Sequence, residues 1–467
     1  MKILFATSEA VPYFKSGGLA DVSRTLPDAL AAAGHDIRII LPFYSAITIH
    51  AAGIETETTQ VPWLAGTVPT RYVTHTEGGP APAVLVDQPG FFHGGSPYST
   101  PAGDPLELGR RFAFFCRAIV HYARHWKPDV IHLNDWTTGL VPVWGVTDDL
   151  DAATVFAIHN LAYQGNFPPA LVAQTGIPPV FYRAENGIEF HGVVSFLKAG
   201  LALSDRLVTV SPTYAREIQT PAYGAGLEGL LHFRRRVLHG ILNGIDTGVW
   251  NPARDPNLAA TYNAKTLGRK MLDRDALIAE SGLDGGGPIV AMVTRLAVQK
   301  GIDLVLRALP HLLEIGARLV VLGDGDAAYE RELAAAARAA PSRIATVLRF
   351  DDALAHRIYA GADFFLMPSR YEPCGLGQMI AQRYGTPPIA RHTGGLVDTV
   401  THEKTGFLFD DASPAAVVGA CRHAFDSWRA RGWNALQRRC MATDWSWARS
   451  AALYAELYRL ATGRLSR

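Results

Sequence analysis

A lysine and two glycines near the start of the chain have the spacing of an anion-binding turn. Lys15, Gly17 and Gly18 follow the apolar run Ile3–Ala6 and precede a helical pattern. Glycines let the backbone come close to a ligand, and the first amides of a helix favour a negative charge. Lys15 would add a mobile ammonium group. The pattern also suits a tight turn beside a solvated lysine, and it is not a P-loop, because the lysine precedes the glycines.

Two cations and a carboxylate follow apolar runs in the second half. Arg295 and Lys300 come after Ile289–Val293. Both could reach one diphosphate, the arginine as a planar fork and the lysine as a point charge. Glu372 comes after Phe364–Met367, where a carboxylate could accept hydrogen bonds from sugar hydroxyls. Taken singly, each cation could also be a solvated surface group, and Glu372 a partner of a helix dipole.

Polar residues also follow two strand candidates of the first half. Asp135 comes shortly after Val130–Leu133, and His159 directly after Thr154–Ile158. An isolated aspartate or histidine is commonly structural, but sheets of this kind bind ligands beyond the carboxyl ends of their strands. We therefore expect Asp135 and His159 to face the same site as Lys15. No His-Glu-x-x-His, paired cysteine or Asp-x-Asp spacing indicates a metal, so no metal ligand is expected.

The elements that must position these residues are short apolar strands alternating with helices, which predicts parallel sheets of an α/β protein. Two doubly wound, Rossmann-like domains facing across a cleft are expected, with 1–242 and 243–445 as the domains and 446–467 as a terminal helix. The Gly- and Pro-rich segment 78–105 is expected to be a surface loop. The expected strands are Ile3–Ala6, Ile37–Leu41, Ala83–Val86, Val130–Leu133, Thr154–Ile158, Arg206–Val210, Ile289–Val293, Leu319–Leu322, Ile344–Leu348, Phe364–Met367 and Pro388–Ala390.

Composition excludes several classes of protein. A formal net charge of +1, from 44 basic and 43 acidic side chains, gives no general attraction for nucleic acid. The sequence has no apolar run of the ~18 residues that a membrane-spanning helix needs. The 4 cysteines are far apart, which favours reduced thiols in a cytoplasmic enzyme. Cys374 has no histidine near it in sequence and is more simply a packing residue than a nucleophile.

Taken together, these segments resemble the bacterial glycogen synthases and the plant starch synthases almost end to end. The motifs that carry the resemblance are Lys-Ser-Gly-Gly-Leu-Ala-Asp-Val at 15–22, His-Asn-Leu-Ala-Tyr-Gln-Gly at 159–165, Asn-Gly-Ile-Asp at 243–246, the segment 295–301, Glu-Pro-Cys-Gly-Leu at 372–376 and Thr-Gly-Gly-Leu at 393–396.

The resemblance implies a GT-B type fold and a retaining transfer of glucose from ADP-glucose to the non-reducing end of an α-1,4-glucan such as glycogen, with no further cofactor. Arg295 and Lys300 would neutralise the departing diphosphate. His159 would lie against the glucose, with its main-chain carbonyl facing the anomeric carbon, and Asp135 would lie near the reacting centre. Glu372 would hold glucose hydroxyls, and the terminal helix would pack back on the first domain.

The resemblance also implies a set of substrate-binding residues. Phe350 would lie against the nucleobase, and the amides of the segment 375–377 would assist Glu372. The full substrate-binding set is Lys15, Gly17, Gly18, Asn160, Asn243, Phe350, Cys374, Gly375, Leu376 and Gly377.

Several positions depart from the family pattern. Ser16 stands for a usual Thr, Thr137 for a common His, Leu108 for an expected Asn and Gly377 for a usual Thr or Ser. They bear on donor affinity and acceptor preference more than on reaction class. Ile380 stands where many other retaining enzymes of this architecture carry a second glutamate, which favours the glycogen synthase branch.

Three other functions remain open from sequence. A UDP-glucose-dependent glycosyltransferase of the same fold would share most of these motifs. A catalytically silent glucan-binding protein would have no reason to retain charged residues such as Lys300 and Glu372. A nucleotide-sugar isomerase would leave the glucan-synthase motifs unexplained.

Overall fold

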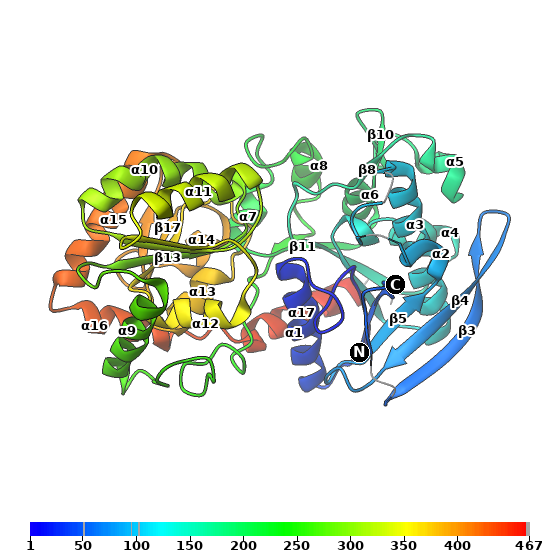
Figure 1. The fold of residues 1–467 in the computed structure, drawn as a ribbon. Coiled ribbons are helices and arrows are strands. Elements are labelled where there is room, and N and C mark those ends of the chain that lie inside the picture. The colour runs from blue at the N-terminus through cyan, green and yellow to red at the C-terminus, as the bar shows by residue number, and fades with distance from the viewer. Residues whose placement is uncertain (50–51, 95, 101–102, 464–467) are drawn as a thin grey trace. The chain divides into compact units, whose positions relative to one another are not determined.

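The chain forms two compact units, seen in Figure 1. The computed structural model describes residues 1–49, 52–94, 96–100 and 103–463. Unit 1 comprises Met1–Gly244 and Trp447–Arg467, and unit 2 comprises Ile245–Ser446. Among the described residues, no helix combines the length and apolarity needed to cross a membrane.

Unit 1 is built on a nine-stranded sheet in the order β12-β11-β7-β6-β1-β2-β5-β4-β3. Its strands are β1 Lys2–Ala6, β2 Asp36–Pro42, β3 Ile54–Trp63, β4 Gly66–His75, β5 Ala83–Asp87, β6 Val130–Asn134, β7 Ala153–Ile158, β11 Arg206–Thr209 and β12 Leu238–Gly240. A small antiparallel sheet adds β8 Asn166–Phe167, β9 Glu189–Phe190 and β10 Val193–Ser195. The helices are α1 Gly18–Ala32, α2 Pro89–Phe92, α3 Pro105–Trp126, α4 Val141–Thr147, α5 Leu171–Thr175, α6 Phe196–Leu203, α7 Pro212–Glu217 and α8 Glu228–Phe233.

The central strands of unit 1 pair in parallel, and their residues are apolar because helices cover both faces of such a sheet. Every residue of β5, β6 and β7 is buried. Strand β1 pairs with β2 on one side and with β6 on the other. The chain order reverses between β1 and β6, and this is the place where a doubly wound sheet binds ligands.

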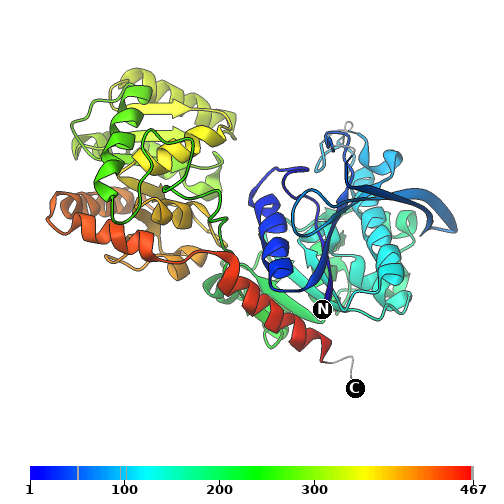
Figure 2. The same ribbon diagram turned by 90° about the horizontal axis from the view of Figure 1, so that it is seen from below.

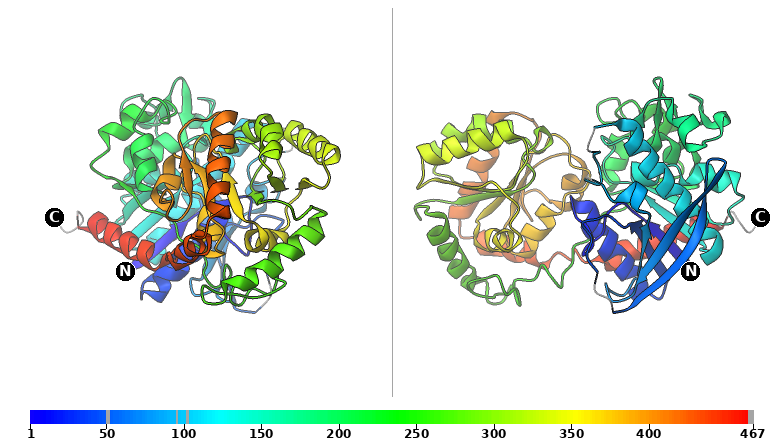
Figure 3. Two further views of the ribbon diagram at one scale, coloured as in Figure 1. Left: turned by 90° about the vertical axis from the view of Figure 1, so that its left-hand side faces the viewer. Right: turned by 45° about the vertical axis from the view of Figure 1, so that its right-hand side comes forward.

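The hairpin β3–β4 at the edge of the sheet was absent from the sequence prediction. Figure 3 shows it in blue at the margin of the molecule. Most residues of β3 are exposed, since the strand reads Ile-Glu-Thr-Glu-Thr-Thr-Gln-Val-Pro-Trp. A strand that is mostly polar lacks the apolar signal of the buried strands.

The described part of the segment 78–105 is more ordered than the surface loop expected from sequence, although β5 within it agrees with the expected strand Ala83–Val86. It contains β5 and the short helix α2. Phe92 is fully buried in unit 1. The expectation is therefore wrong for this part of the chain, because aromatic side chains anchor the Gly- and Pro-rich segment.

Unit 2 is built on a six-stranded parallel sheet in the order β15-β14-β13-β16-β17-β18. The strands are β13 Ile289–Val293, β14 Arg318–Leu322, β15 Ile344–Val347, β16 Phe364–Met367, β17 Pro388–Arg391 and β18 Phe407–Phe409. The helices are α9 Lys270–Ser281, α10 Ile302–Glu314, α11 Ala327–Ala339, α12 Asp352–Gly361, α13 Gly377–Arg383, α14 Gly394–Thr399, α15 Pro414–Arg429 and α16 Trp433–Ala442. This is the Rossmann strand order, and its switch point lies between β13 and β16.

The last helix, α17 (Trp447–Thr462), belongs to unit 1 although it follows unit 2 in sequence. It packs against α1, β6 and β7, and Figure 2 shows it in red beside the blue α1. The hydroxyl of Ser450 donates to the carbonyl of Leu242 at 2.5 Å. The hydroxyl of Tyr458 lies 3.0 Å from Nδ1 of His132, a buried residue of β6.

Candidate active site

Asp135 is the first residue after β6, and its carboxylate accepts hydrogen bonds from the backbone that follows β7. Its Oδ1 accepts the amide of His159 at 2.8 Å, and its carboxylate also accepts the amide of Asn160. Asp135 has a φ of 53°, which a non-glycine residue adopts only when its surroundings hold it there. Burial raises the pKa of its carboxyl group to about 7, against the lowering effect of the two amides. Asp135 therefore links the ends of two neighbouring strands at the switch point of unit 1.

His159 is a neutral hydrogen-bonding group rather than a cation. Burial lowers the pKa of its imidazole to about 4. The side chain of Asn134 donates to the carbonyl of Ala6 at 2.8 Å, so its Oδ1 faces His159 Nε2, also at 2.8 Å. Nε2 of His159 therefore carries the proton, and Nδ1 is the acceptor of the ring.

The segment 15–18, called the donor loop below, connects the chain after β1 to helix α1. The ammonium group of Lys15 lies 2.8 Å from Oδ1 of Asp21, and both side chains are more than a third exposed. Gly17 has a φ of −161°, which any residue adopts, and a Cβ there would meet no atom within 4 Å. Neither the backbone conformation nor the packing of the described residues therefore requires a glycine at position 17. A glycine would be needed there if a ligand fills the open space beside it.

Glu9 is a residue of this site that the sequence prediction missed. It lies three residues after β1 and is 4% exposed. Its Oε2 accepts the amide of Ser16 at 2.6 Å and the hydroxyl of Ser16 at 3.0 Å. Glu9 therefore ties the donor loop to the switch point of unit 1. No motif of the sequence marks it, because its partners lie seven or more residues away.

Two predicted asparagines lie at other turns of unit 1. Asn160 is half-buried, and its Oδ1 accepts the amide of Ala162 at 3.1 Å. Asn243 follows β12 and is 6% exposed, and no described residue donates a hydrogen bond to its buried Oδ1. A buried acceptor without a donor is costly unless another molecule satisfies it.

Lys300, which is partly buried, and Glu372, which is buried, form an ion pair at the switch point of unit 2. Lys300 comes after β13 and Glu372 after β16, and these two strands are neighbours. Nζ of Lys300 lies 2.9 Å from Oε1 and 2.6 Å from Oε2 of Glu372, and the hydroxyl of Ser369 donates to Oε2 at 2.9 Å. The two side chains are 18% and 6% exposed. Fixed charges of both signs are therefore held where a Rossmann sheet binds its ligand.

Two other predicted residues of unit 2, Arg295 and Phe350, have exposed side chains. Arg295 comes directly after Thr294 at the end of β13, and its side chain lies at the surface. Phe350 is 70% exposed between β15 and α12. An exposed phenylalanine is unfavourable in water, and a flat ring is suited to stacking on a planar ligand.

The segment 374–377 leads from Glu372 into α13. Cys374 is 5% exposed, which suits the packing role expected from sequence. Gly375 has a φ of +74°, where a side chain would be strained. A Cβ on Gly377 would lie 2.8 Å from Cε1 of the buried Phe365 ring. The absence of a Thr or Ser hydroxyl at 377 thus has a packing reason, and Leu376 lies between these two glycines at the N-cap of α13.

The structure therefore brings the predicted residues together in two groups. In unit 1 Asp135, His159 and Asn160 are in direct contact, and Glu9 connects the donor loop to the same edge of the sheet. In unit 2 Lys300 and Glu372 are in direct contact, and Arg295 and the segment 374–377 flank them in sequence.

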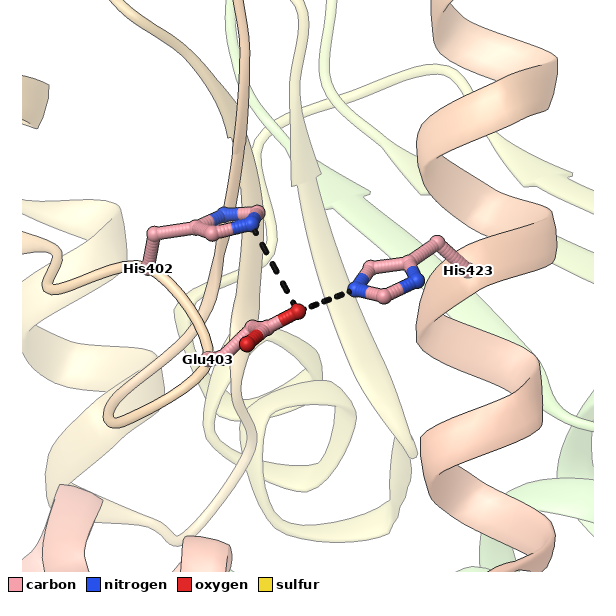
Figure 4. A group of neighbouring side chains, drawn as sticks. All are labelled: His402, Glu403 and His423. Atoms are coloured by element: carbon pink, nitrogen blue, oxygen red, sulfur yellow. Dashed lines mark hydrogen bonds and ion pairs between the residues drawn. The ribbon is translucent and has the colours of Figure 1, made fainter.

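A second cluster of titratable groups, His402, Glu403 and His423, lies on the surface of unit 2 (Figure 4). Nε2 of His423 lies 2.8 Å and Nε2 of His402 3.8 Å from Oε1 of Glu403. The amide of Leu408 donates to Nδ1 of His402 at 3.0 Å. The neutral ring of His402 therefore carries its proton on Nε2, the atom that would have to bind a metal. This cluster is a hydrogen-bonded surface group in which metal binding would break the Leu408 bond.

Comparison with known proteins gives matches to both units. Residues 2–233 match the family model described as the starch synthase catalytic domain, and residues 273–434 match glycosyl transferases group 1. A glycogen synthase of Anaeromyxobacter dehalogenans is 47% identical, with 99% of this chain and 100% of the relative covered. Glycogen synthase 1 of Methylococcus capsulatus is 46% identical over 98% of this chain and 96% of its own.

Solved structures are also similar to this chain, and one of them matches it over almost its full length. It is the catalytic domain of starch synthase IV from Arabidopsis thaliana, bound to ADP and acarbose. Its sequence is 34% identical, the TM-score is 0.89, and the match covers 99% of both chains. The expected GT-B fold is thereby confirmed.

Proposed function

Because the chain belongs to the family of bacterial glycogen synthases and plant starch synthases, we propose that it transfers glucose from ADP-glucose to the non-reducing end of an α-1,4-glucan such as glycogen, with retention of configuration. The observation that carries the proposal is the ion pair of the partly buried Lys300 and the buried Glu372. A nucleotide sugar needs a cation for its diphosphate and hydrogen-bond acceptors for its glucose hydroxyls, and this pair offers both.

The cations act on the leaving group. Negative charge builds on the diphosphate as the bond to glucose breaks, so cations already in place stabilise the transition state more than the ground state. Lys300 is fixed by Glu372, whose carboxylate also accepts the hydroxyl of Ser369, and Arg295 lies exposed at the surface. Glu372 binds glucose hydroxyls, with the amides of the segment 375–377 assisting.

Residues of unit 1 act on the sugar and the acceptor. Lys15, Gly17 and Gly18 contact the donor, and the open space beside Gly17 supports this role. The amide of His159 is held by Asp135, so the main chain at 159 is fixed where it meets the glucose. Asn160 and Asn243 complete the substrate-binding residues of unit 1. Cys374 and Phe350 belong to unit 2, and Phe350 stacks on the adenine of the donor.

Retention needs a defined path for the acceptor's proton. A double displacement requires a carboxylate on the face of the sugar opposite the leaving group. Asp135 binds two backbone amides and has a raised pKa, which lowers the fraction of carboxylate available as a nucleophile. We favour attack on the same face, in which the acceptor hydroxyl adds to the anomeric carbon, the diphosphate leaves, and its oxygen takes the proton.

Product analysis tests the reaction. The protein would be incubated with labelled ADP-glucose and glycogen, and the product digested from its non-reducing ends. Release of the label in the first digestion products supports the proposal, and label that resists the digestion contradicts it. A covalent glucosyl enzyme trapped on Asp135 or another carboxylate would overturn the same-face path.

A cytoplasmic location is part of this proposal. The four cysteines, all within the described residues, are buried and form no disulfide, which suits a reducing compartment.

A further inference from the structure

We propose that Glu9 is the positioning residue of the donor loop and that Tyr98 and Arg111 keep it in place, an inference that rests on the proposed function of this loop in binding ADP-glucose. Neither the motifs of the sequence nor the family comparison assigns a role to Glu9. Its side chain connects the chain after β1 with the donor loop, seven residues on, and with Tyr98, 89 residues on, at the switch point of the sheet.

The first step is that the carboxylate of Glu9 forms hydrogen bonds with the donor loop. Glu9 accepts the amide and the hydroxyl of Ser16, and it also accepts the amide of Gly17. These donors lie directly before α1, where backbone amides have no partner within the helix. An ionised carboxylate accepts all of them at once, whereas a neutral side chain of the same shape cannot. The loop is therefore fixed by a single buried carboxylate, and the ammonium group of Lys15 is left at the surface.

The second step is that Tyr98 forms a hydrogen bond with Glu9. The hydroxyl of Tyr98 donates to Oε1 of Glu9 at 3.2 Å and lies 2.9 Å from Oγ of Ser8. The ring of Tyr98 stacks on Phe112 of α3, with 6.2 Å between ring centroids. Glu9 is thus held at both oxygens, by Ser16 on one side and by Tyr98 on the other.

The third step is that Arg111 forms hydrogen bonds with backbone carbonyls on both sides of Tyr98 in the chain. The guanidinium group of Arg111, in α3, is 3% exposed. It donates to the carbonyls of Phe91, Gly94, Ser96, Pro97 and Ser99 at 2.8 to 3.2 Å. A buried arginine that binds five backbone carbonyls fixes the backbone at those five residues. Arg111 thus sets the position of Tyr98, Tyr98 that of Glu9, and Glu9 that of the donor loop.

Glu9 also acts on Asp135 through charge. Its carboxylate contributes to the raised pKa of Asp135, because two nearby negative charges repel each other. Removal of the Glu9 charge should therefore lower the pKa of Asp135. The KM for ADP-glucose, compared with the KM for glycogen, separates positioning of the donor loop from a general structural role.

Replacement of Glu9 by glutamine tests the inference. In Glu9→Gln the side chain becomes neutral, so its bonds to the amide and hydroxyl of Ser16 lose their charge assistance. Its amide nitrogen fits only where the hydroxyl of Tyr98 turns to accept from it. We expect the KM for ADP-glucose to rise by about tenfold or more, the scale for one hydrogen bond to a charged group. The KM for glycogen should change by less than about twofold, and the acid limb of kcat/KM should move to lower pH. Tyr98→Phe should raise the same KM by a smaller factor.

Controls separate the possible outcomes. Glu57→Gln removes an exposed carboxylate of β3, and wild-type KM values are expected for it. Unchanged donor KM and pH profile in both Glu9→Gln and Tyr98→Phe would overturn the inference, as would an equal rise of both KM values. If Glu9→Gln does not fold, the KM of Tyr98→Phe for ADP-glucose tests the inference by itself. A wild-type protein without turnover of ADP-glucose would instead contradict the proposed function.

Discussion

Lys300 donates to both carboxylate oxygens of Glu372, at 2.9 and 2.6 Å, in a pair whose carboxylate is buried and whose ammonium group is partly exposed. In the proposed reaction Lys300 binds the diphosphate and Glu372 binds the glucose of the same donor. Donor binding therefore replaces part of an existing interaction between two fixed charges. Such a site needs little rearrangement when charge develops in the transition state.

Loss of either member of this pair should abolish most of the turnover. Lys300→Ala and Glu372→Ala are each expected to lower kcat by about a hundredfold or more, the scale for one preorganised electrostatic group. The measurement is initial-rate kinetics with saturating ADP-glucose and glycogen. Lys265→Ala removes an exposed lysine of unit 2 and serves as the matched control. Near-normal rates in either variant would contradict the assigned role.

The Lys300–Glu372 pair should also affect the melting temperature of the protein. Lys300→Ala leaves the carboxylate of Glu372 buried without its cation, whereas Lys300→Met combined with Glu372→Leu removes both charges. We expect the single variant to melt at a lower temperature than the double variant in scanning calorimetry. A single variant as stable as the wild type would show that water already solvates Glu372.

The raised pKa of Asp135 predicts a pH-dependent loss of stability. Its carboxyl group titrates at about 7 in the folded chain instead of the ordinary 3.8. Below pH 3.8 it is protonated in both states, and as the pH rises towards 7 the unfolded chain releases the proton first. The free energy of unfolding of the wild type therefore loses a contribution from Asp135 as the pH rises from about 4 to 7. The variant Asp135→Asn has no carboxyl group at this position and lacks this loss.

Thermal unfolding at several pH values measures this effect. The Tm of Asp135→Asn relative to wild type should rise between about pH 5 and pH 7 and then level off. Asp151→Asn, which removes an exposed carboxylate of the same unit, should show no such trend. A constant difference between Asp135→Asn and wild type across this range would mean that Asp135 has no raised pKa.

Gly377 offers a test of why this chain lacks a hydroxyl at the start of α13. In Gly377→Ser the new Cβ would lie 2.8 Å from the ring of Phe365, so we expect a lower Tm and weaker ADP-glucose binding. Phe365→Leu should offset part of that loss when the two are combined. Equal stability of Gly377→Ser and wild type would show that the ring moves aside freely.

The strands that position the site could be predicted from sequence because they are buried on both faces. Ile289–Val293 and Phe364–Met367 were predicted with the same bounds that the structure shows. Strand β18 was not predicted, since three residues, Phe407–Phe409, are too short to give a pattern. Strands β3 and β4 were missed because an edge hairpin with many exposed polar residues has no apolar run.

The candidate site was predictable to the extent that its residues directly follow strands. Asp135 and His159 could be expected to meet, because parallel neighbouring strands end at one edge of a sheet. Glu9 could not be found in this way, because its significance comes from bonds to Ser16 and Tyr98. The roles assigned to the individual site residues stay predictions until the variants are measured.

The most direct test of the central claim is a primed assay with radiolabelled ADP-glucose and UDP-glucose in parallel, with and without glycogen. The account predicts that label enters glycogen from ADP-glucose far faster than from UDP-glucose, and only when the glucan is present. Comparable turnover of UDP-glucose, or product formed without the glucan, would contradict it.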